Sequence, residues 1–411
     1  MLSYGTSIPA ARTAAGRHVG IDALQLVFGV SGGVETYADM LVSALLDADN
    51  RVTVICDAGQ LPVLRNRHGD RAGYFVIGAG LAARLAVKAW NLVRPARERL
   101  PAERAFLTFS RLAEDLGIEV LHSPVQLFTK LDFRVPAVLN LHDLQHLHHP
   151  EHFSAGELDT RHRVWARSAS LANAIIVSSD FVRQDLVARL ALPTSKIHTV
   201  PISWNPAVEA GLQRFTAEAA RGHYGLPARY AYYPAQFWPH KNHVRLLEAL
   251  RSVREQRPGA DLKLVLTGYR GHAGWPQIEQ ALARLGLANN VLCLDHVPVE
   301  HVAALYQASL FCVIPSTFEG SSQPVIEAQM LGVPVMCSNL PSISELVADR
   351  TGLLFDPLDP RDISAKMLRW VDDADDRRQH AERASARVRR ERSLDRYARR
   401  VLDVYRSVAI Q

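Results

Sequence analysis

Two carboxylates lie on either side of a short polar turn within residues 317–335. Glu319 precedes the turn, and Glu327 follows it with seven residues between the two acids. The turn itself consists of Gly320, Ser321, Ser322 and Gln323. A helix expected at 324–331 starts directly after it, so free backbone amides and the positive end of the helix dipole point at this turn. The arrangement predicts a seat for a phosphate group.

The pair of acids indicates what else the ligand carries. A carboxylate does not bind phosphate, but it accepts hydrogen bonds from hydroxyl groups. Because the chain doubles back in the turn, Glu319 and Glu327 can both reach one ligand lying across the helix start. Such a ligand has hydroxyls at both ends and phosphate between them, which describes a nucleotide-sugar. The alternative for Glu327 is compensation of the helix dipole, worth about 0.3–1 kcal/mol, but this does not require Glu319.

Two further candidates lie at strand ends. Lys241 follows an expected strand at 229–234 and stands near the start of an expected helix at 244–255. A cation there is unfavourable unless an anion is bound beside it, which favours a phosphate contact; the alternative is a solvated surface lysine. His142 follows an expected buried strand at 137–141, at the edge where open parallel sheets bind ligands. The alternative for His142 is a histidine that bonds a nearby carbonyl group.

A glycine pair follows the first expected strand, at 18–24. Gly32 and Gly33 precede a helix expected at 34–46, and glycine lets a backbone approach a phosphate closely. The loop lacks the full Gly-x-Gly-x-x-Gly pattern, so by itself it is also typical of a simple turn.

The strands that must position these residues alternate with helical stretches along the chain. This alternation predicts an α/β fold with parallel sheets covered on both faces. Further strands are expected at 52–56, 120–122, 174–178, 197–200, 262–267, 291–295 and 310–314, and another is expected to start at 333–335. With 411 residues the chain is long enough for two domains. We expect a mobile tail at 1–17, a first domain at 18–203 and a second domain at 204–393.

One stretch resembles the Glu-x7-Glu signature of retaining glycosyltransferases of family 4, through Glu319, Glu327, Ala328, Gly332 and Pro334. The resemblance covers most of residues 18–411. It implies the GT-B fold, in which two Rossmann-like domains with parallel sheets face each other across a cleft. The acceptor would bind to 18–203 and the nucleotide-sugar to 204–393, and the last helix, 394–411, would pack back on the first domain.

The resemblance also implies a role for each candidate. Glu319 would bind hydroxyls of the donor sugar, Glu327 the ribose and Lys241 the diphosphate, while His142 would line the donor-sugar pocket. We expect His142, Lys241 and Glu319 to act in catalysis. Donor binding is also expected from Gly32, Gly33, Gln236, Gly320, Ser321, Ser322 and Gln323.

One position departs from the family pattern. Most members have an arginine five residues before the lysine, whereas this chain has Gln236. Gln236 can donate hydrogen bonds but supplies no charge. Either Lys241 and the backbone amides suffice for the diphosphate, or another basic residue substitutes.

The resemblance implies transfer of a sugar with retention at the anomeric carbon and without a metal ion or other cofactor. No residue is a clear nucleophile, which favours a same-face attack in which the leaving phosphate takes the acceptor's proton. The loop after His142 resembles that of mannosyltransferases of polysaccharide assembly. We therefore expect GDP-mannose or a UDP-sugar as donor, with mannose as the first choice, and a glycan or lipid-linked acceptor.

Other functions remain open. A sugar-nucleotide epimerase or hydrolase of the same fold would turn over the donor without an acceptor. A non-catalytic nucleotide-sugar-binding protein is a further alternative, made credible by Gln236. A nicotinamide dehydrogenase is disfavoured, because the first loop lacks the dinucleotide fingerprint and only Asp57 ends the second strand.

The composition is that of a globular protein, with 48% hydrophobic and 22% charged residues. The formal net charge of +5 is modest, and no aromatic-spaced basic stripe indicates a nucleic-acid partner. Residues 1–17 contain no apolar core of the kind found in secretory signals. The four scattered cysteines favour buried thiols in a reducing cytoplasm, and we expect a cytoplasmic protein.

Two segments raise alternatives outside the main site. Residues 81–104 predict a basic amphipathic helix, which is compatible with peripheral contact at the inner membrane face; the alternative is a solvated face over a packed one. The acidic run 372–376 is interpreted as a solvated turn rather than a metal motif. The histidines at 146, 148, 149 and 152 show no clean metal-ligand spacing and are interpreted as a polar loop. No metal site is expected.

Overall fold

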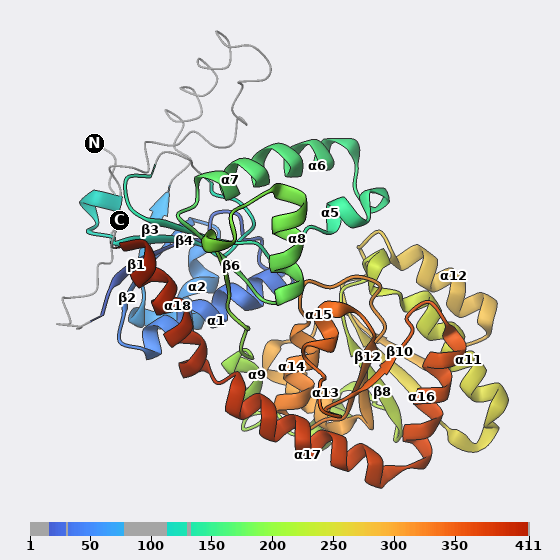
Figure 1. Cartoon of the computed structure of the whole chain (residues 1–411). Helices are drawn as coiled ribbons and strands as arrows, with labels where there is room; N and C mark the ends of the chain where they lie inside the picture. Colours follow the sequence, from blue (N-terminus) through green and yellow to red (C-terminus); the bar gives the residue numbers. More distant parts are fainter. Residues whose placement is uncertain (1–15, 30–31, 78–112, 130–132, 410–411) are drawn as a thin grey trace.

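The chain folds into two lobes, each built on one parallel sheet (Figure 1). The structure is a computed structural model and describes residues 16–29, 32–77, 113–129 and 133–409. The basic helix expected at 81–104 lies outside the described residues, as does all but the end of the tail expected at 1–17. The predicted α/β fold with two parallel sheets is confirmed.

The first sheet has the strand order β3-β2-β1-β4-β5-β6-β7. Its strands are β1 (His18–Asp22), β2 (Arg51–Asp57), β3 (Gly73–Ile77), β4 (Val120–Ser123), β5 (Ala137–Asn140), β6 (Ala174–Val177) and β7 (Ile197–Thr199). The helices of this lobe are α1 (Gly33–Asp47), α2 (Leu61–His68), α5 (Gln145–His148), α6 (Ala155–Thr160), α7 (Ala166–Leu171) and α8 (Asp180–Leu190).

The second sheet has the order β10-β9-β8-β11-β12-β13. Its strands are β8 (Tyr230–Pro234), β9 (Lys263–Thr267), β10 (Val291–Leu294), β11 (Phe311–Ile314), β12 (Val335–Ser338) and β13 (Leu353–Phe355). The helices of this half of the chain are α9 (Pro206–Gly211), α10 (Ala217–Tyr224), α11 (His243–Gln256), α12 (Trp275–Leu285), α13 (Val299–Ala308), α14 (Gln323–Met330), α15 (Pro341–Ser344), α16 (Pro360–Asp372), α17 (Ala374–Glu391) and α18 (Leu394–Ala409).

The central strands are buried and largely apolar because both of their faces are covered. Every residue of β1, β4, β5, β6, β11 and β12 is buried. A parallel strand packed on both faces needs a nearly continuous apolar run rather than an alternating one. In each sheet the strand order reverses at one place, between β1 and β4 and between β8 and β11. Ligands of open parallel sheets bind at the carboxyl ends of strands beside such a reversal.

The last helix belongs to the first lobe in space, although it follows the second lobe in sequence. Figure 1 shows α17 running across the second lobe and α18 continuing to the first, where it packs against α1. The apolar face of α18 is buried there, and the hydroxyl of Tyr397 donates to the hydroxyl of Tyr37 on α1 at 2.7 Å.

A buried polar chain ties α18 to three strands of the first sheet. Nε2 of His122 lies 2.6 Å from Oδ1 of Asn140, and Nδ1 of His122 lies 2.6 Å from the hydroxyl of Tyr405. Because the amide oxygen only accepts, Nε2 carries the proton and Nδ1 accepts from Tyr405. Burial lowers the pKa of His122 to about 4, which keeps this neutral arrangement at pH 7. Asn140 in turn donates to the carbonyl of Ile176 at 3.4 Å.

We expect Tyr405→Phe to destabilise the protein by about 1–3 kcal/mol, because Nδ1 of His122 loses its donor while it stays buried. Urea unfolding of the full chain measures this difference. Tyr269→Phe is the matched control, since Tyr269 is 54% exposed, and it should change the unfolding free energy by less than about 0.5 kcal/mol. Equal effects of the two substitutions would contradict the polar chain as a stabilising element.

Candidate active site

The lobes meet where loops leave the carboxyl ends of their strands. The hydroxyl of Ser179, at the start of α8, donates to the carbonyl of Gly320 at 2.7 Å. A Cβ atom added to Gly320 would collide with the carbonyl oxygen of His142, so the turn predicted to seat a phosphate needs glycine at this contact. The carboxylate of Glu345 also accepts from the backbone amides of Asp180 and Phe181, at 3.1 and 3.0 Å. The predicted turn therefore lies directly against the first lobe.

Two of the predicted residues form an ion pair at this interface. Nζ of Lys241 lies 2.7 Å from Oε1 of Glu319, and the two side chains are only 20% and 10% exposed. The loops that carry them follow β8 and β11, which are neighbours in the second sheet. The structure thus brings together a cation and a carboxylate that are 78 residues apart in the chain.

The backbone around Lys241 is held by contacts that the sequence did not reveal. Lys241 ends a 3-10 turn, Pro239–Lys241, and the next residue, Asn242, has a positive φ of 60°. The side-chain amide of Asn242 donates to the carbonyls of Pro315 and Pro357, each at 2.8 Å. Asn242 therefore fastens the lysine loop to the segment that leads into Glu319. The only sequence signal for this role was the position of Asn242 directly after Lys241. The left-handed backbone conformation of Asn242 is not apparent from the sequence alone.

Glu327 occupies a different environment from Glu319. It is 7% exposed on α14, and the hydroxyl of Tyr306 donates to its Oε2 at 3.2 Å. Burial raises the pKa of Glu327 to about 7. A carboxylate in such a position gains from hydroxyl donors, which is the role expected for it. Tyr306, which precedes α14 by one strand, had no signal in the sequence that linked it to Glu327.

The turn before α14 holds polar atoms without partners among the described residues. The hydroxyls of Ser321 and Ser322 are buried and make no hydrogen bond there. Ser322 occupies the N-cap position of α14 without capping it. Buried hydroxyls are normally paired, so these two are available to a ligand at the helix start. The side chain of Gln323 is engaged elsewhere, since it donates to the carbonyl of Ser203 at 3.2 Å.

His142 makes the contact with a carbonyl group that was its alternative interpretation from the sequence, and one of its ring nitrogens stays free of that contact. Its Nε2 lies 2.8 Å from the carbonyl oxygen of Pro124, so Nε2 is the donor and Nδ1 is left as an acceptor. Burial lowers the pKa of His142, which favours this neutral form. The ring of Tyr37 meets it edge-on, with 4.9 Å between centroids. His142 can therefore accept a hydrogen bond from a hydroxyl but cannot donate one through Nδ1.

Gly32 and Gln236 face each other from opposite lobes. Gly32 is the N-cap of α1, with a φ of 56°, and a Cβ atom added to it would lie 3.8 Å from Cγ of Gln236. Oε1 of Gln236 accepts from the backbone amide of Tyr269 at 2.8 Å. A Cβ atom on Gly33 would meet nothing within 4 Å among the described residues. The glycine pair is thus open to the space where the lobes approach each other.

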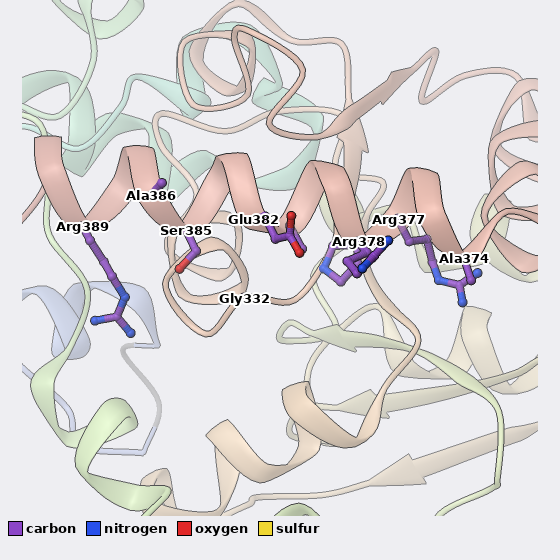
Figure 2. A pocket seen from close by; sticks show the side chains of 10 residues that line it. Gly332, Ala374, Arg377, Arg378, Glu382, Ser385, Ala386 and Arg389 are labelled. Atoms are coloured by element: carbon purple, nitrogen blue, oxygen red, sulfur yellow. The ribbon is translucent and has the colours of Figure 1, made fainter.

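A groove of about 680 Å³ lies away from this interface, along α17. Figure 2 shows the side chains of Arg377, Arg378 and Arg389 along the helix beside the turn at Gly332. That turn is at the opposite end of α14 from the ion pair. Arg389 is already bonded to Glu209 and to the carbonyl of Met330, and Arg378 is paired with Asp375. We do not assign the groove to the active site.

The acidic run 372–376 is accounted for by local structure. The side chain of Asp373 accepts from the amide of Asp376 at 2.8 Å and caps α17. The carboxylate of Asp376 accepts from Arg369 at 2.9 Å and from the indole of Trp370 at 3.0 Å.

No helix in the described part of the chain is both long and apolar enough to cross a membrane.

Comparisons with known proteins bear on this site. The family model described as Glycosyltransferase Family 4 matches residues 31–204, and the one described as Glycosyl transferases group 1 matches residues 223–387. The chain is 32% identical over 247 residues to the O-antigen chain mannosyltransferase B of Escherichia coli, a match that covers 58% of this chain and 61% of that protein. It is 27% identical over 303 residues to a D-inositol 3-phosphate glycosyltransferase of Corynebacterium jeikeium, covering 68% and 71%.

A solved structure shares the whole architecture. The Anabaena protein HepE, in complex with UDP and glucose, superposes with a TM-score of 0.72 and 18% identity, covering 95% of this chain and all of that one. The two family models together cover most of both lobes, from residue 31 to residue 204 and from residue 223 to residue 387 within α17. The resemblance seen in the Glu-x7-Glu stretch is therefore confirmed: this chain belongs to family 4 of the glycosyltransferases, and its two-lobed fold is the GT-B fold.

Proposed function

We propose that the chain transfers a sugar from a nucleotide-diphosphate-sugar to a hydroxyl of a glycan or lipid-linked acceptor, with retention at the anomeric carbon. The observation that carries the proposal is the shielded pair of Lys241 and Glu319 beside the start of α14. A phosphate can form an ion pair with Lys241, and sugar hydroxyls can donate hydrogen bonds to the carboxylate of Glu319. One ligand that carries both groups can therefore replace the ion pair and leave neither the ammonium nor the carboxylate without a polar partner.

The second lobe would contact the sugar, the phosphates and the ribose of the donor. The hydroxyls of Ser321 and Ser322, which have no partner in the described part of the chain, and the backbone amides at the start of α14 would face the sugar and phosphates. Glu327 would accept hydrogen bonds from the ribose. As the bond between the anomeric carbon and the phosphate oxygen breaks, negative charge develops on the diphosphate, and Lys241 stabilises it. In this proposal no metal ion takes part, because the lysine and the helix start supply the positive charge.

The first lobe would bind the acceptor and help to position the donor sugar. Nδ1 of neutral His142 would accept a hydrogen bond from a sugar hydroxyl. The acceptor hydroxyl would attack the anomeric carbon on the face that the phosphate leaves. Its proton would pass to an oxygen of the departing diphosphate, so no side-chain base is required. Gly32 and Gly33, open toward Gln236, would let the first lobe's backbone approach the diphosphate.

The donor is proposed from the relatives. The Escherichia coli relative is a mannosyltransferase, which makes GDP-mannose the first choice, and the Anabaena structure holds UDP and glucose, which makes a UDP-sugar the second. All four cysteines are free, which supports a reducing cytoplasm as the place of action.

Turnover of the donor in the absence of an acceptor would indicate an epimerase or a hydrolase rather than a glycosyltransferase.

We expect Lys241→Ala to lower kcat/KM for the preferred donor by about 10²- to 10³-fold, because a cation that stabilises the leaving group is lost. Initial rates measured over a panel of nucleotide-sugars provide the readout. Lys366→Ala is the matched control, since Lys366 also pairs with an acid, Asp362, but on α16. If both variants keep wild-type rates, Lys241 does not bind the diphosphate.

The raised pKa of Glu327 predicts a pH-dependent effect on stability. Between pH 4.5 and about 7 the folded protein keeps this proton and the unfolded chain has lost it, so the contribution of Glu327 to stability falls as pH rises. Glu327→Gln removes that dependence. We therefore expect the variant to gain stability relative to the wild type as pH increases across this window and to change no further above it.

Denaturant unfolding of both proteins at several pH values measures this gap. The matched control is the same substitution at the exposed Glu279, which should leave the unfolding free energy within about 0.5 kcal/mol of the wild type. A gap that is constant from pH 4.5 to 8 would rule out a buried, protonated Glu327.

A further inference from the structure

Three side chains of the ligand-bearing types converge in the loop between α5 and α6. His149, Glu151 and His152 each offer one atom, and these three atoms lie within 4.8 Å of one another. Nδ1 of His149 is 3.1 Å from Oε1 of Glu151, and Nε2 of His152 is 3.8 Å from the same oxygen. The two rings are stacked, with 5.2 Å between centroids and 14° between planes. The loop interpreted as merely polar thus contains an ordered cluster.

The other two histidines of this loop are used elsewhere. Nε2 of His148 lies 2.8 Å from a carboxylate oxygen of Asp185 on α8. His146 packs edge-on against Trp165, with 4.9 Å between ring centroids. These roles separate the structural histidines from the converging pair. From spacing alone the four were indistinguishable, because the 3-10 turn Pro150–His152 decides which rings face each other.

The donor set has a definite chemical preference. Two imidazoles and one carboxylate suit a borderline divalent transition metal such as Zn²⁺, whereas Mg²⁺ and Ca²⁺ prefer sites made of oxygens. Tetrahedral bonds of about 2.0–2.1 Å place neighbouring ligand atoms roughly 3.3 Å apart. Oε1 of Glu151 lies 3.1 Å from Nδ1 of His149 and 3.8 Å from Nε2 of His152, on either side of this value, and all three atoms lie within 4.8 Å of one another. Small side-chain movements are therefore enough to bring the three atoms to one ion.

The two ring nitrogens of His152 have different surroundings. Nε2 faces Oε1 of Glu151 at 3.8 Å, whereas Nδ1 is buried and has no hydrogen-bond partner among the described residues. A neutral imidazole carries its proton on one ring nitrogen and offers the other as an acceptor or metal ligand. With the proton on Nδ1, the nitrogen that faces Glu151 is available to a metal ion.

A fourth histidine approaches from the second lobe. The ring of His240 lies 6.3 Å from that of His152, and the ring of His149 lies 5.7 Å from Phe318. His240 and Phe318 directly precede Lys241 and Glu319 in the chain. The cluster therefore lies across from the two loops that carry the ion pair.

We propose that His149, Glu151 and His152 bind a divalent transition-metal ion of the zinc type, with His240 as the ligand from the second lobe. Such an ion joins the loop after α5 to the lysine loop and so limits the separation of the lobes. Its role is to link them, and it takes no part in the transfer of the sugar. The proposal does not depend on the identity of the donor.

The experiment is a calorimetric titration of the full chain, freed of metal by a chelator, with Zn²⁺ and with no nucleotide present. We expect one tight site, weakened at least tenfold by His149→Ala, His152→Ala or Glu151→Gln. Glu151 is exposed, so Glu151→Gln tests the site even if a histidine variant fails to fold. His296→Ala, at an exposed position on the second lobe, is the matched control and should bind as the wild type does.

Two results would overturn the proposal. One is the absence of zinc binding to the wild type, and the other is equal affinity in the wild type and in the variants of the cluster. His240→Ala tests the link between the lobes, since wild-type affinity in that variant would remove His240 from the site. Titration with Co²⁺ adds a spectroscopic check, because the bound ion should show a visible spectrum without a thiolate band, which separates the cluster from cysteine sites.

Discussion

The ion pair between Lys241 and Glu319 is the constraint on which the site depends. Neither charge would be stable alone in so shielded a position, and the two lie in loops far apart in the chain. They meet because β8 and β11 are adjacent at the place where the strand order of the second sheet reverses. The sheet therefore sets the position of the pair, and Asn242 holds the lysine loop against the segment that leads to the glutamate.

Contact between the lobes follows from the same geometry. The reversal in the first sheet lies between β1 and β4, and the loops after these strands carry Gly32 and Pro124. Pro124 orients His142, and the carbonyl of His142 leaves no room for a side chain at residue 320. The two crossover points thus face each other with glycines at 32 and 320. A side chain at residue 320 would act on the spacing of the lobes before it acted on any ligand, whereas a Cβ atom at residue 32 would only make ordinary contact with the side chain of Gln236.

Local signals predicted much of this arrangement from the sequence. The bounds of the helix after the turn and of the helix after Lys241 were right to within one residue, because proline, glycine and apolar spacing mark helix ends directly. Two strands were missed, β3 and β13, which lie at the edges of their sheets; β13 has only three residues. The partners of Glu319 and Glu327 were not predictable, since Lys241 and Tyr306 reach them only through the packing of distant elements. For the same reason the hydrogen bond from the side chain of Gln323 to the carbonyl of Ser203 could not be predicted from the sequence.

The return of α18 to the first lobe orders events during synthesis. The ribosome makes β1 to β7 first, then the whole second lobe, and only then the helix whose Tyr397 and Tyr405 complete the interior beside α1 and β4. Until that helix emerges, Tyr37 and His122 belong to an unfinished surface on the nascent chain. The first lobe is therefore begun early and closed last, and a ribosome stalled within the second lobe would hold it open.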